Sequence, residues 1–298
     1  MREVVVECEL HNPLGFCTPL KGKWLDCMIK LIATDMDGTF LTDAKTYDKV
    51  LFEHLFDKFM TDDIKFVAAS GNQYRQIIQQ FPKHKDQMSF VAENGGHIIE
   101  NGRTLQEEFE TVEAVSALVN YIEKYYPDTV INLVGKELSY LPKSTPEKIK
   151  ELLSYYLPVL KYVDNLHPIP DDRYFKVTLL VRDDLTAKIQ TEINTIFADY
   201  QLAATSSGFG CIDVIPSHVH KGTGLDFLLN HWGYGPENLM VFGDGGNDIE
   251  MLKLAKYSFA MANAPQEIKS IACYEAPSNQ ENGVLQILSN YFLKGNKL

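Results

Sequence analysis

The chain of 298 residues lacks any long uninterrupted apolar run, so no segment is long enough to cross a bilayer as a helix. Basic side chains are also scarce: 28 lysines and arginines face 40 aspartates and glutamates, for a formal net charge of -12. An acidic surface repels the nucleic-acid backbone, which argues against a polynucleotide partner. It repels anionic metabolites as well, so a phosphate-binding site needs local cations of its own.

The cysteines are few and form no recognisable framework. There are five, an odd number, and no C-x-x-C pair occurs. This argues against a disulfide scaffold and a zinc site, and it fits a reducing, cytoplasmic location. Three of the five lie in residues 1–27, a segment with neither a basic start nor a long apolar stretch. We expect residues 1–27 to be a disordered, dispensable N-terminal extension; an arm docked on the rest of the protein is the alternative.

Short apolar runs alternate with helical patterns along the chain, which is typical of an α/β protein with a mainly parallel sheet. Four of these runs lead into polar residues: residues 31–34 into Asp35, residues 65–69 into Ser70, residues 89–92 into Glu93, and residues 239–243 into Asp244. Open α/β sheets bind ligands at the carboxyl ends of their strands. We therefore expect these polar residues to converge on one crevice.

The middle of the chain, residues 109–210, reads as a separate α/β block inserted into this pattern. Helical periodicity covers residues 112–126 and 185–197, and another helix is expected with Thr145 as its N-cap and Pro146 as its first helical residue. Strands are expected at residues 130–134, 174–181, 201–205 and 211–215, with the main unit resuming at residue 211.

The strongest chemical signal is DMDGT at residues 35–39, directly after an apolar strand. Gly38 permits the chain to turn so that two carboxylates face one site. Asp35, at the strand tip, is a candidate nucleophile toward phosphorus. Asp37 is a candidate acid that protonates the leaving oxygen and a base that later deprotonates water. A simple Asp-Gly turn is the alternative reading.

A second signal is GDGGND at residues 243–248, before a helix expected at residues 249–255. Asp244 can supply a hard oxygen ligand for magnesium. Asp248, near the helix start, either caps the helix and supports the metal ligands or contacts the metal itself. Asn247 either donates to a phosphate oxygen or shapes the turn.

Candidate phosphate-binding groups occur elsewhere in the chain. Lys221, just before a helix that includes residues 225–229, can neutralise a phosphate, although a lone lysine there is more often a surface residue. Ser70, at a strand end, can donate its hydroxyl, although such a serine is often a simple cap or turn residue.

Together and in this order, DMDGT, Ser70, Lys221 and GDGGND resemble the four motifs of the haloacid dehalogenase-like hydrolases. Residues 31–43, 66–75, 91–96, 206–213 and 240–264 resemble the Cof-type branch of that superfamily, which includes bacterial sugar phosphatases. The resemblance extends from Met28 to the C-terminus. It implies a doubly wound, Rossmann-like parallel-sheet core, residues 28–108 and 211–298, with a type IIB α/β cap at residues 109–210.

The resemblance also implies roles for individual residues. Asp35 would be the nucleophile and Asp37 the general acid/base. Mg²⁺ would be bound by the Asp35 carboxylate, the Asp37 backbone carbonyl and Asp244, with Asp248 behind them. The phosphoryl group would be held by Ser70, Gly71, Lys221 and Asn247, and candidate substrate contacts from the cap are Lys176 and Phe209. Many relatives have Thr-Gly-Arg where this chain has Ser70-Gly71-Asn72, so here phosphate binding would depend more on Lys221 and the metal.

The sequence thus predicts a magnesium-dependent phosphatase that passes a phosphoryl group from a small metabolite, by resemblance a sugar phosphate, through Asp35 to water. A phosphomutase of the same superfamily and a non-catalytic sugar-phosphate sensor are the alternatives. We expect a monomer or homodimer with a small phosphorylated metabolite as its partner, and neither a nucleic-acid nor a membrane partner.

Overall fold

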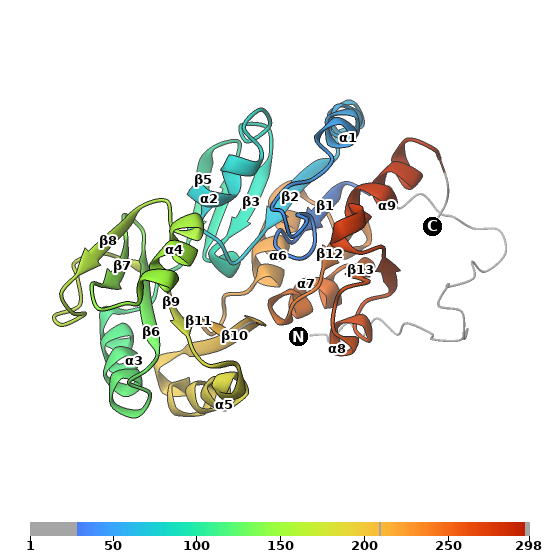
Figure 1. The fold of residues 1–298 in the computed structure, drawn as a ribbon. Coiled ribbons are helices and arrows are strands. Elements are labelled where there is room, and N and C mark those ends of the chain that lie inside the picture. Colours follow the sequence, from blue (N-terminus) through green and yellow to red (C-terminus); the bar gives the residue numbers. More distant parts are fainter. Residues whose placement is uncertain (1–28, 209, 296–298) are drawn as a thin grey trace.

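Two β-sheets and the helices around them make up the computed structural model, which describes residues 29–208 and 210–295 (Figure 1). The predicted extension, residues 1–27, and Phe209 lie outside the described residues. The larger sheet has the order β14 (Tyr274–Ala276), β13 (Tyr257–Met261), β12 (Leu239–Gly243), β1 (Leu31–Thr34), β2 (Lys65–Ala69), β3 (Ser89–Ala92), β4 (His97–Glu100) and β5 (Arg103–Glu107).

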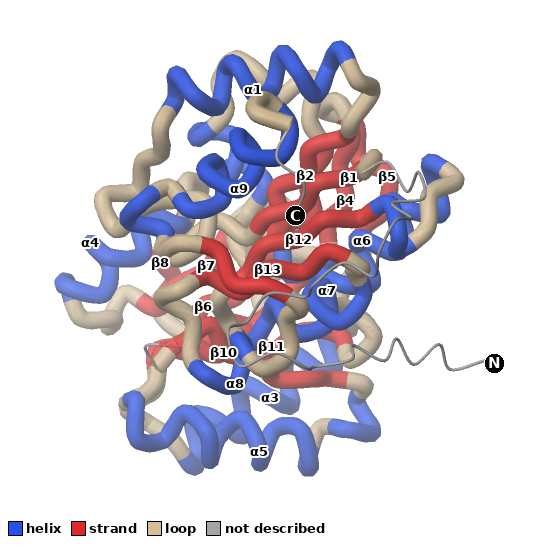
Figure 2. The backbone as a smooth tube through the Cα atoms, turned by 90° about the vertical axis from the view of Figure 1, so that its right-hand side faces the viewer, coloured by secondary structure: helices blue, strands red, loops and turns tan. Residues whose placement is uncertain are grey.

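The strands from β14 to β3 are parallel, and Figure 2 shows β2, β1, β12 and β13 side by side. From β1 the chain moves outward to β2 and β3, and after the inserted block it returns to β12 on the other side of β1. The order therefore reverses between β1 and β12, as in doubly wound folds. At the β3 edge, β4 and β5 continue the sheet as antiparallel strands. The fold class predicted from the sequence is confirmed.

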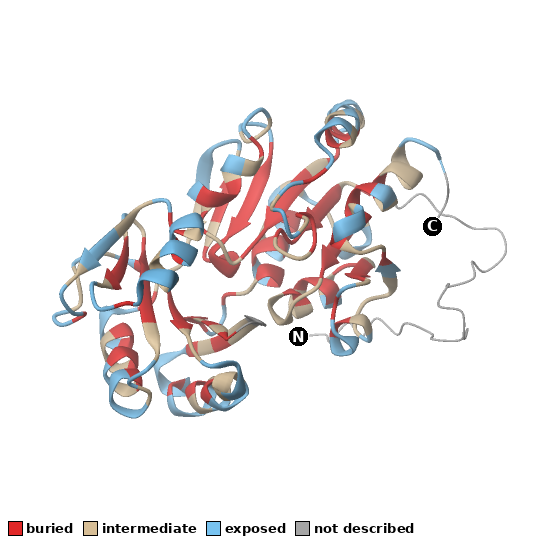
Figure 3. Cartoon of the chain, in the orientation of Figure 1, coloured by how far each residue is buried: buried red, intermediate tan, exposed pale blue. Residues whose placement is uncertain are grey.

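Two apolar layers cover this sheet, one on each face. Alternate residues of each central strand point to opposite faces, so Ile32 lies in one layer while Leu31 and Ala33 lie in the other. The first layer includes α1 (Lys49–Thr61) and α9 (Gly283–Phe292), and the second includes α6 (Lys221–Trp232) and α7 (Ile249–Leu254). Burial on both faces explains why β1 is apolar up to Thr34, its last residue, and Figure 3 shows the buried strands between exposed helix surfaces.

The second sheet has the order β10 (Leu202–Gly208), β11 (Cys211–Pro216), β9 (Tyr174–Leu180), β6 (Val130–Gly135), β7 (Ser139–Pro142) and β8 (Leu160–Val163). Its apolar core forms with α3 (Val112–Tyr125) and α5 (Thr186–Ile196), onto which Val177 and Leu179 of β9 face. Lys176 and Thr178, which alternate with these two residues along β9, lie on the opposite face. The face that packs on α3 and α5 is therefore apolar, whereas the opposite face carries polar side chains as well as a smaller apolar cluster of Leu141, Leu153 and Leu157.

The structure differs from the sequence prediction at two boundaries. The helix α4 (Glu147–Tyr156) begins one residue later than predicted: Pro146, not Thr145, is its N-cap, because Pro146 has an extended ψ of 141°. The strand β11, which the sequence assigned to the main unit, pairs with β9 and β10 in the second sheet. Alternating apolar residues identify a strand but not the sheet that it joins.

Lys221 is the first residue of α6 rather than a residue ahead of it. Two short α-helices also belong to the larger sheet's unit: α2 (Tyr74–Ile77) follows β2, and α8 (Gln266–Lys269) follows β13. Along residues 29–208 and 210–295, no helix has the length and apolar character needed to cross a lipid bilayer.

Candidate active site

The site lies where three parallel strands end. The last residue of β1, Thr34, is aligned with Phe242 of β12 and with Ala68 of β2. Asp35 follows directly, and its backbone N–H donates to the Phe242 carbonyl oxygen at 3.0 Å. The carboxyl ends of all three strands therefore meet at the position where the strand order reverses, and the residues directly after β12 and β2 are Asp244 and Ser70.

The loop after β1 has to pass very close to Asp244. Gly38 has a φ of +84°, and a Cβ atom at this position would lie 2.4 Å from Asp244 Oδ2. No other residue type fits both the left-handed backbone and this approach. The next residue, Thr39, donates its hydroxyl to Asp244 Oδ1 at 2.6 Å and so ties the loop to the end of β12.

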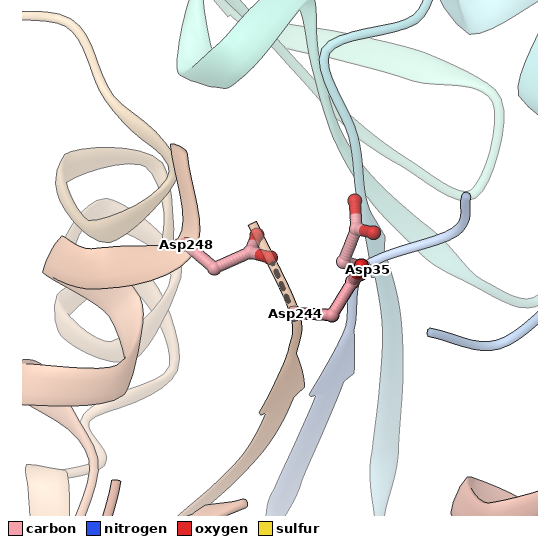
Figure 4. Close-up of side chains that lie close together, drawn as sticks. All are labelled: Asp35, Asp244 and Asp248. Carbon is pink, nitrogen blue, oxygen red and sulfur yellow. Dashed lines mark hydrogen bonds between the residues drawn. The ribbon is translucent and has the colours of Figure 1, made fainter. Parts of the chain in front are cut away.

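Three carboxylates converge at this edge of the sheet. Asp35, Asp244 and Asp248 each offer an oxygen within 4.8 Å of the others (Figure 4). Asp248 is fully buried, and its Oδ2 accepts hydrogen bonds of 2.9 Å from the backbone N–H groups of Asp244 and Gly245. Asp248 thereby shapes the loop that carries Asp244.

A single buried lysine faces two of these carboxylates. Lys221 is 0% exposed, and its Nζ donates to Asp35 Oδ1 at 2.6 Å and to Asp248 Oδ1 at 2.7 Å. The lysine is held in place by the start of α6, where the His220 side chain accepts a hydrogen bond from the backbone N–H of Thr223. Such short, charge-assisted contacts are among the stronger hydrogen bonds in proteins.

The electrostatics of this cluster follow from its burial and crowding. Burial raises the pKa of Asp35 well above its usual range; the Lys221 charge opposes this, while Asp248 and Asp244 add to it. Burial and the Asp248 charge raise the pKa of Asp244 to about 6. Burial alone would lower the pKa of Lys221, but Asp248 and Asp35 raise it above its usual range. The lysine therefore stays charged, and the carboxylates remain short of positive charge.

The donor set fits a hard divalent cation. Among the described residues, no hydrogen bond reaches Asp35 Oδ2 or Asp244 Oδ2, whereas both oxygens of Asp248 are occupied by Lys221 and by backbone N–H groups. Carboxylate oxygens are the ligands that Mg²⁺ prefers, and it commonly takes only one or two of them from the protein. Asp35 and Asp244 are thus better placed to bind a metal than Asp248 is.

The Ser70 loop is fixed by backbone contacts beside this cluster. Ser70 is 2% exposed, its N–H donates to the Val91 carbonyl oxygen, and its Oγ accepts the Asn72 N–H at 3.1 Å. Asn94 N donates to the Ser70 carbonyl oxygen at 3.0 Å. The Asn94 side chain in turn accepts from Asn247 Nδ2 at 3.0 Å, so Asn94 connects two predicted phosphate-binding segments.

A tight turn after β3 positions Asn94. Glu93, Asn94 and Gly95 all have positive φ, at 51°, 56° and 108°. Consecutive left-handed residues are costly for side chains other than glycine, and they concentrate at functional sites. A Cβ atom at Gly95 would lie 2.4 Å from the His220 carbonyl oxygen, so the turn packs directly against the start of α6.

Lys176 connects the second sheet to the Ser70 loop. Its side chain is 8% exposed, and its Nζ donates to the Gly71 carbonyl oxygen at 2.6 Å and to Asp213 Oδ2 at 2.8 Å. Glu93 Oε2 lies 3.5 Å away. Burial alone would lower the pKa of Lys176, but Asp213 and Glu93 raise it above its usual range. The ammonium group is thus engaged by protein groups at the junction of the two sheets.

Asp213 is shared between the two units. Besides Lys176, it accepts hydrogen bonds from Thr178 Oγ1 at 2.7 Å and from Asn94 Nδ2 at 2.8 Å. Burial raises the pKa of Glu93 to about 7; Lys176 opposes this shift and Asp213 adds to it. A chain of polar contacts therefore runs from Asn247 through Asn94 to the polar face of the second sheet.

Asp37 points to a different set of partners. Its Oδ1 accepts from Lys45 Nζ at 2.5 Å and its Oδ2 from Asn72 Nδ2 at 2.6 Å. Burial alone would lower the pKa of Lys45, but its hydrogen bond to Asp37 and the Asp37 charge raise it above its usual range. The positive charge next to Asp37 therefore comes from the loop after β1, and Asn72 contributes a neutral donor.

The structure thus brings most of the predicted site residues to one edge of the larger sheet. The carboxylate cluster contains Asp35, Asp244 and Asp248, and Lys221 contacts two of these carboxylates. Asn94, Lys176 and Asn72 connect the other predicted residues to this edge: Ser70, Gly71, Asn247 and Asp37. The sequence prediction missed Lys45, Asn94 and Asp213, and it did not identify Asn72 as a partner of Asp37. The strand-end position of Glu93-Asn94-Gly95 was the available signal for Asn94; nothing in the sequence marked Lys45.

Comparison with known proteins identifies the class that this fold and carboxylate site define. The sequence profile of the haloacid dehalogenase-like hydrolases matches residues 32–288. The chain belongs to this family of hydrolases, and within it the chain is a phosphatase.

Particular relatives match over nearly their whole length. The chain is 39% identical over 260 residues to the 5-amino-6-(5-phospho-D-ribitylamino)uracil phosphatase YbjI of Escherichia coli, covering 87% of this chain and 95% of that protein. Among solved structures, SMU.1108c from Streptococcus mutans superposes with a TM-score of 0.87 at 46% identity, covering 89% of this chain and 99% of the other. The subclass IIB sugar phosphatase BT4131 shares the fold, with a TM-score of 0.75 at 20% identity over 88% of this chain and 98% of the other.

Proposed function

We propose that this phosphatase hydrolyses the phosphate monoester of a small, sugar-derived metabolite in two displacements through Asp35. The observation that carries the proposal is the contact between Lys221 and Asp35: a fully buried ammonium 2.6 Å from a carboxylate at a strand tip, with Asp244 beside it. Phosphoryl transfer needs a positioned nucleophile and positive charge around the transferring group more than it needs covalent chemistry from the protein.

In the first displacement, a carboxylate oxygen of Asp35 attacks phosphorus and the bond from phosphorus to the ester oxygen breaks. The leaving oxygen is an alkoxide of high pKa, so it needs a proton, which Asp37 donates. The products are the free alcohol and a phosphoryl group on Asp35. Lys221, Ser70 and the Gly71 and Asn247 donors hold the phosphoryl oxygens during this step.

In the second displacement, Asp37, now a carboxylate, takes a proton from water while the water oxygen attacks phosphorus. The bond from phosphorus to Asp35 breaks, and Asp35 leaves as a carboxylate. Inorganic phosphate is released, and both aspartates return to their starting protonation states. Hydrolysis, rather than transfer to a second position on the substrate, follows when water is the acceptor.

Magnesium fits this site. The Asp35 and Asp244 carboxylates, together with the Asp37 backbone carbonyl, would hold it, and when bound it supplies positive charge that offsets the carboxylates and the phosphate. Asp248 would support these groups through its hydrogen bonds to the Asp244 loop and to Lys221.

The second sheet, within residues 109–216, would act as the cap that covers the substrate. Its polar face meets the Ser70 loop through Lys176 and Asp213, and this contact supports a role in holding the cap closed. Phe209, whose role as a substrate contact stays a prediction, belongs to the same part of the chain. The Escherichia coli relative is named as a phosphatase of 5-amino-6-(5-phospho-D-ribitylamino)uracil, which supports a small phosphorylated metabolite as the substrate; a sugar phosphate stays a prediction.

The test is phosphate release from a panel of esters with and without Mg²⁺. The panel contains sugar phosphates, polyol phosphates, 5-amino-6-(5-phospho-D-ribitylamino)uracil, nucleotides and phosphopeptides. We expect the first three classes to be hydrolysed fastest. An isomerised ester without free phosphate would identify a phosphomutase instead, and tight binding without turnover would identify a sensor.

Trapping the covalent species tests the role of Asp35. In an Asp37→Asn variant the second displacement lacks its base, so p-nitrophenyl phosphate should give a burst of nitrophenol and a phosphorylated peptide containing Asp35. If no burst and no added mass appear, while wild-type protein releases phosphate, the displacement through Asp35 is wrong.

A further inference from the structure

Both oxygens of the Asp37 carboxylate are held by other side chains. Lys45 Nζ donates to Oδ1 at 2.5 Å, and Asn72 Nδ2 donates to Oδ2 at 2.6 Å. The two donors come from different segments, the loop after β1 and the loop after β2. A carboxylate that accepts a hydrogen bond at each oxygen has little freedom to rotate, so these two donors determine its orientation.

Lys45 is placed by its backbone rather than by chance. It has a left-handed φ of 55° and closes a turn in which its N–H donates to the Thr42 carbonyl oxygen at 2.8 Å. The turn is closed again by Thr42, which donates to the Thr46 carbonyl oxygen through both its N–H and its hydroxyl. Left-handed geometry is unfavourable for a lysine, and such geometry persists where the surrounding structure enforces it.

Lys45 also faces the second sheet's unit. Its Nζ lies 5.5 Å from the centre of the Tyr156 ring, at the last residue of α4, a distance at which a cation is attracted to an aromatic face. The neighbouring Tyr155 hydroxyl accepts a hydrogen bond from Gln80 Nε2 of the larger sheet's unit at 3.2 Å. Lys45 therefore lies between Asp37 and the helix α4, half-buried at 32% exposure.

We infer that Lys45 is a positioning residue for Asp37: with Asn72 it orients the acid/base carboxylate, and its contact with Tyr156 makes that orientation depend on closure of the second unit. The inference deepens the proposed function and rests on it. It also accounts for the neutral Asn72 in the Ser70 loop, because the cation of this region is contributed by Lys45. Lys45 acts through Asp37 and need not touch the substrate.

The dependence of the rate on the leaving group separates positioning from a structural role. Protonation by Asp37 matters for a sugar phosphate, whose leaving alkoxide is strongly basic, and matters little for p-nitrophenyl phosphate, whose leaving group is stable as an anion. A Lys45→Met variant should therefore lose about 10²-fold in kcat on the sugar phosphate that the wild type turns over fastest. The rate of the first displacement on p-nitrophenyl phosphate, measured as nitrophenol release in a single turnover, should change by less than about threefold, since this step scarcely needs the acid.

Lys45→Arg keeps the charge and should restore most of the lost rate. Tyr156→Leu should slow the first displacement on the sugar phosphate more than on the aryl ester. A matched control is Lys83→Met, which removes a lysine from an exposed ion pair with Glu53 and should change neither substrate's rate. Thermal unfolding of each variant checks that it is folded.

Equal losses in the rate of the first displacement on both substrates in a folded Lys45→Met variant, or no loss on either, would overturn the inference and leave the proposed function intact. So would a Lys45→Arg variant that is as slow as Lys45→Met. If the wild type releases phosphate from none of the esters, the proposed function fails, and the positioning role of Lys45 fails with it.

Discussion

Replacing Lys221 with methionine is the most direct perturbation of the carboxylate cluster. Methionine has nearly the same length but no charge, so the change removes the ammonium group without opening a large cavity. It leaves Asp35 and Asp248 without the cation that lies 2.6 and 2.7 Å from them, and Asp244 remains close by. Because Lys221 is 0% exposed, water cannot easily take the place of the lost charge.

The structure sets the expected size of the effect. Opposite unit charges 2.6 Å apart attract by about 6 kcal/mol at an effective dielectric constant of about 20. The cost of dehydrating the ammonium group opposes this attraction, and removing one partner of a buried ion pair typically costs about 3–5 kcal/mol in the free energy of unfolding. Turnover should fall by about 10²–10³, the loss associated with one preorganised electrostatic group at a transition state.

The assay pairs Lys221→Met with the double variant Lys221→Met/Asp248→Asn, measuring urea unfolding and kcat on the same samples. Asparagine still accepts the N–H groups of the Asp244 loop but carries no charge. The double variant should therefore regain part of the lost stability, because the unpaired buried charge of Asp248 has been removed. It should not regain activity, because Asp35 still lacks its cation.

Two results would refute this reasoning. A folded Lys221→Met protein with near-wild-type kcat would remove Lys221 from the catalytic centre. A double variant less stable than Lys221→Met would show that repulsion between buried carboxylates is not what destabilises the single variant.

Three further predictions follow from other parts of the structure. Chelation of divalent cations should abolish phosphate release and lower the melting temperature, with Mg²⁺ restoring both and Ca²⁺ restoring turnover poorly; full turnover after rigorous chelation would contradict the metal site. Lys176→Met should cost about 3–5 kcal/mol in unfolding free energy, since Asp213 and Glu93 lose a buried partner, whereas the exposed control Lys188→Met should cost less than about 1 kcal/mol. Burial lowers the pKa of His97 from 6.5 to about 4, so the unfolded chain binds a proton first as pH falls. Stability is therefore unaffected by His97 above pH 6.5 and declines by about 3 kcal/mol toward pH 4. In urea unfolding, His97→Gln should lose less stability over that range, and parallel curves would refute the assignment.

The central strands of the larger sheet were predictable because burial on both faces requires mainly apolar residues. β1, β2, β3 and β12 are buried on both faces, so each is a short apolar run that stops at a polar or glycine residue. The hairpin of β4 and β5 was missed. Its Asn101-Gly102 turn, with φ of 50° and 74°, is a strong hairpin signal that the polar sequence around it obscured.

Sheet membership and cap position depend on contacts that periodicity cannot express. β11 alternates like any half-buried strand, and only its pairing with β9 assigns it to the second sheet. Thr145 followed by proline is a common helix start, but here Thr145 is buried in a turn closed by its N–H to the Pro142 carbonyl oxygen. This local turn, which the Thr-Pro pattern does not reveal, moves the N-cap to Pro146.

The sequence likewise predicts only part of the candidate site. Asp35, Asp244 and Ser70 follow strands, so the topology rule for parallel sheets predicts that they meet. The contacts that join them to the second sheet do not follow from that rule: Asn94 bonds to Asp213, which is 119 residues away in the chain, and Lys45 reaches Asp37 through a strained turn. Such residues lie at no fixed offset from a motif, and their partners are determined only when the chain has folded.

The position of β1 has a consequence for how the protein is made. β1 pairs on one side with β2, which follows it closely, and on the other with β12, which comes after the whole second sheet. At a synthesis rate of about 5–20 residues per second, one edge of this buried, mainly apolar strand waits roughly ten to forty seconds for its partner. An unpaired apolar edge is a template for aggregation, so the nascent chain has a window in which chaperones matter most. Lys221 and Asp244 also emerge late, and the nucleophile therefore meets its cation and its neighbouring carboxylate only when translation is nearly complete.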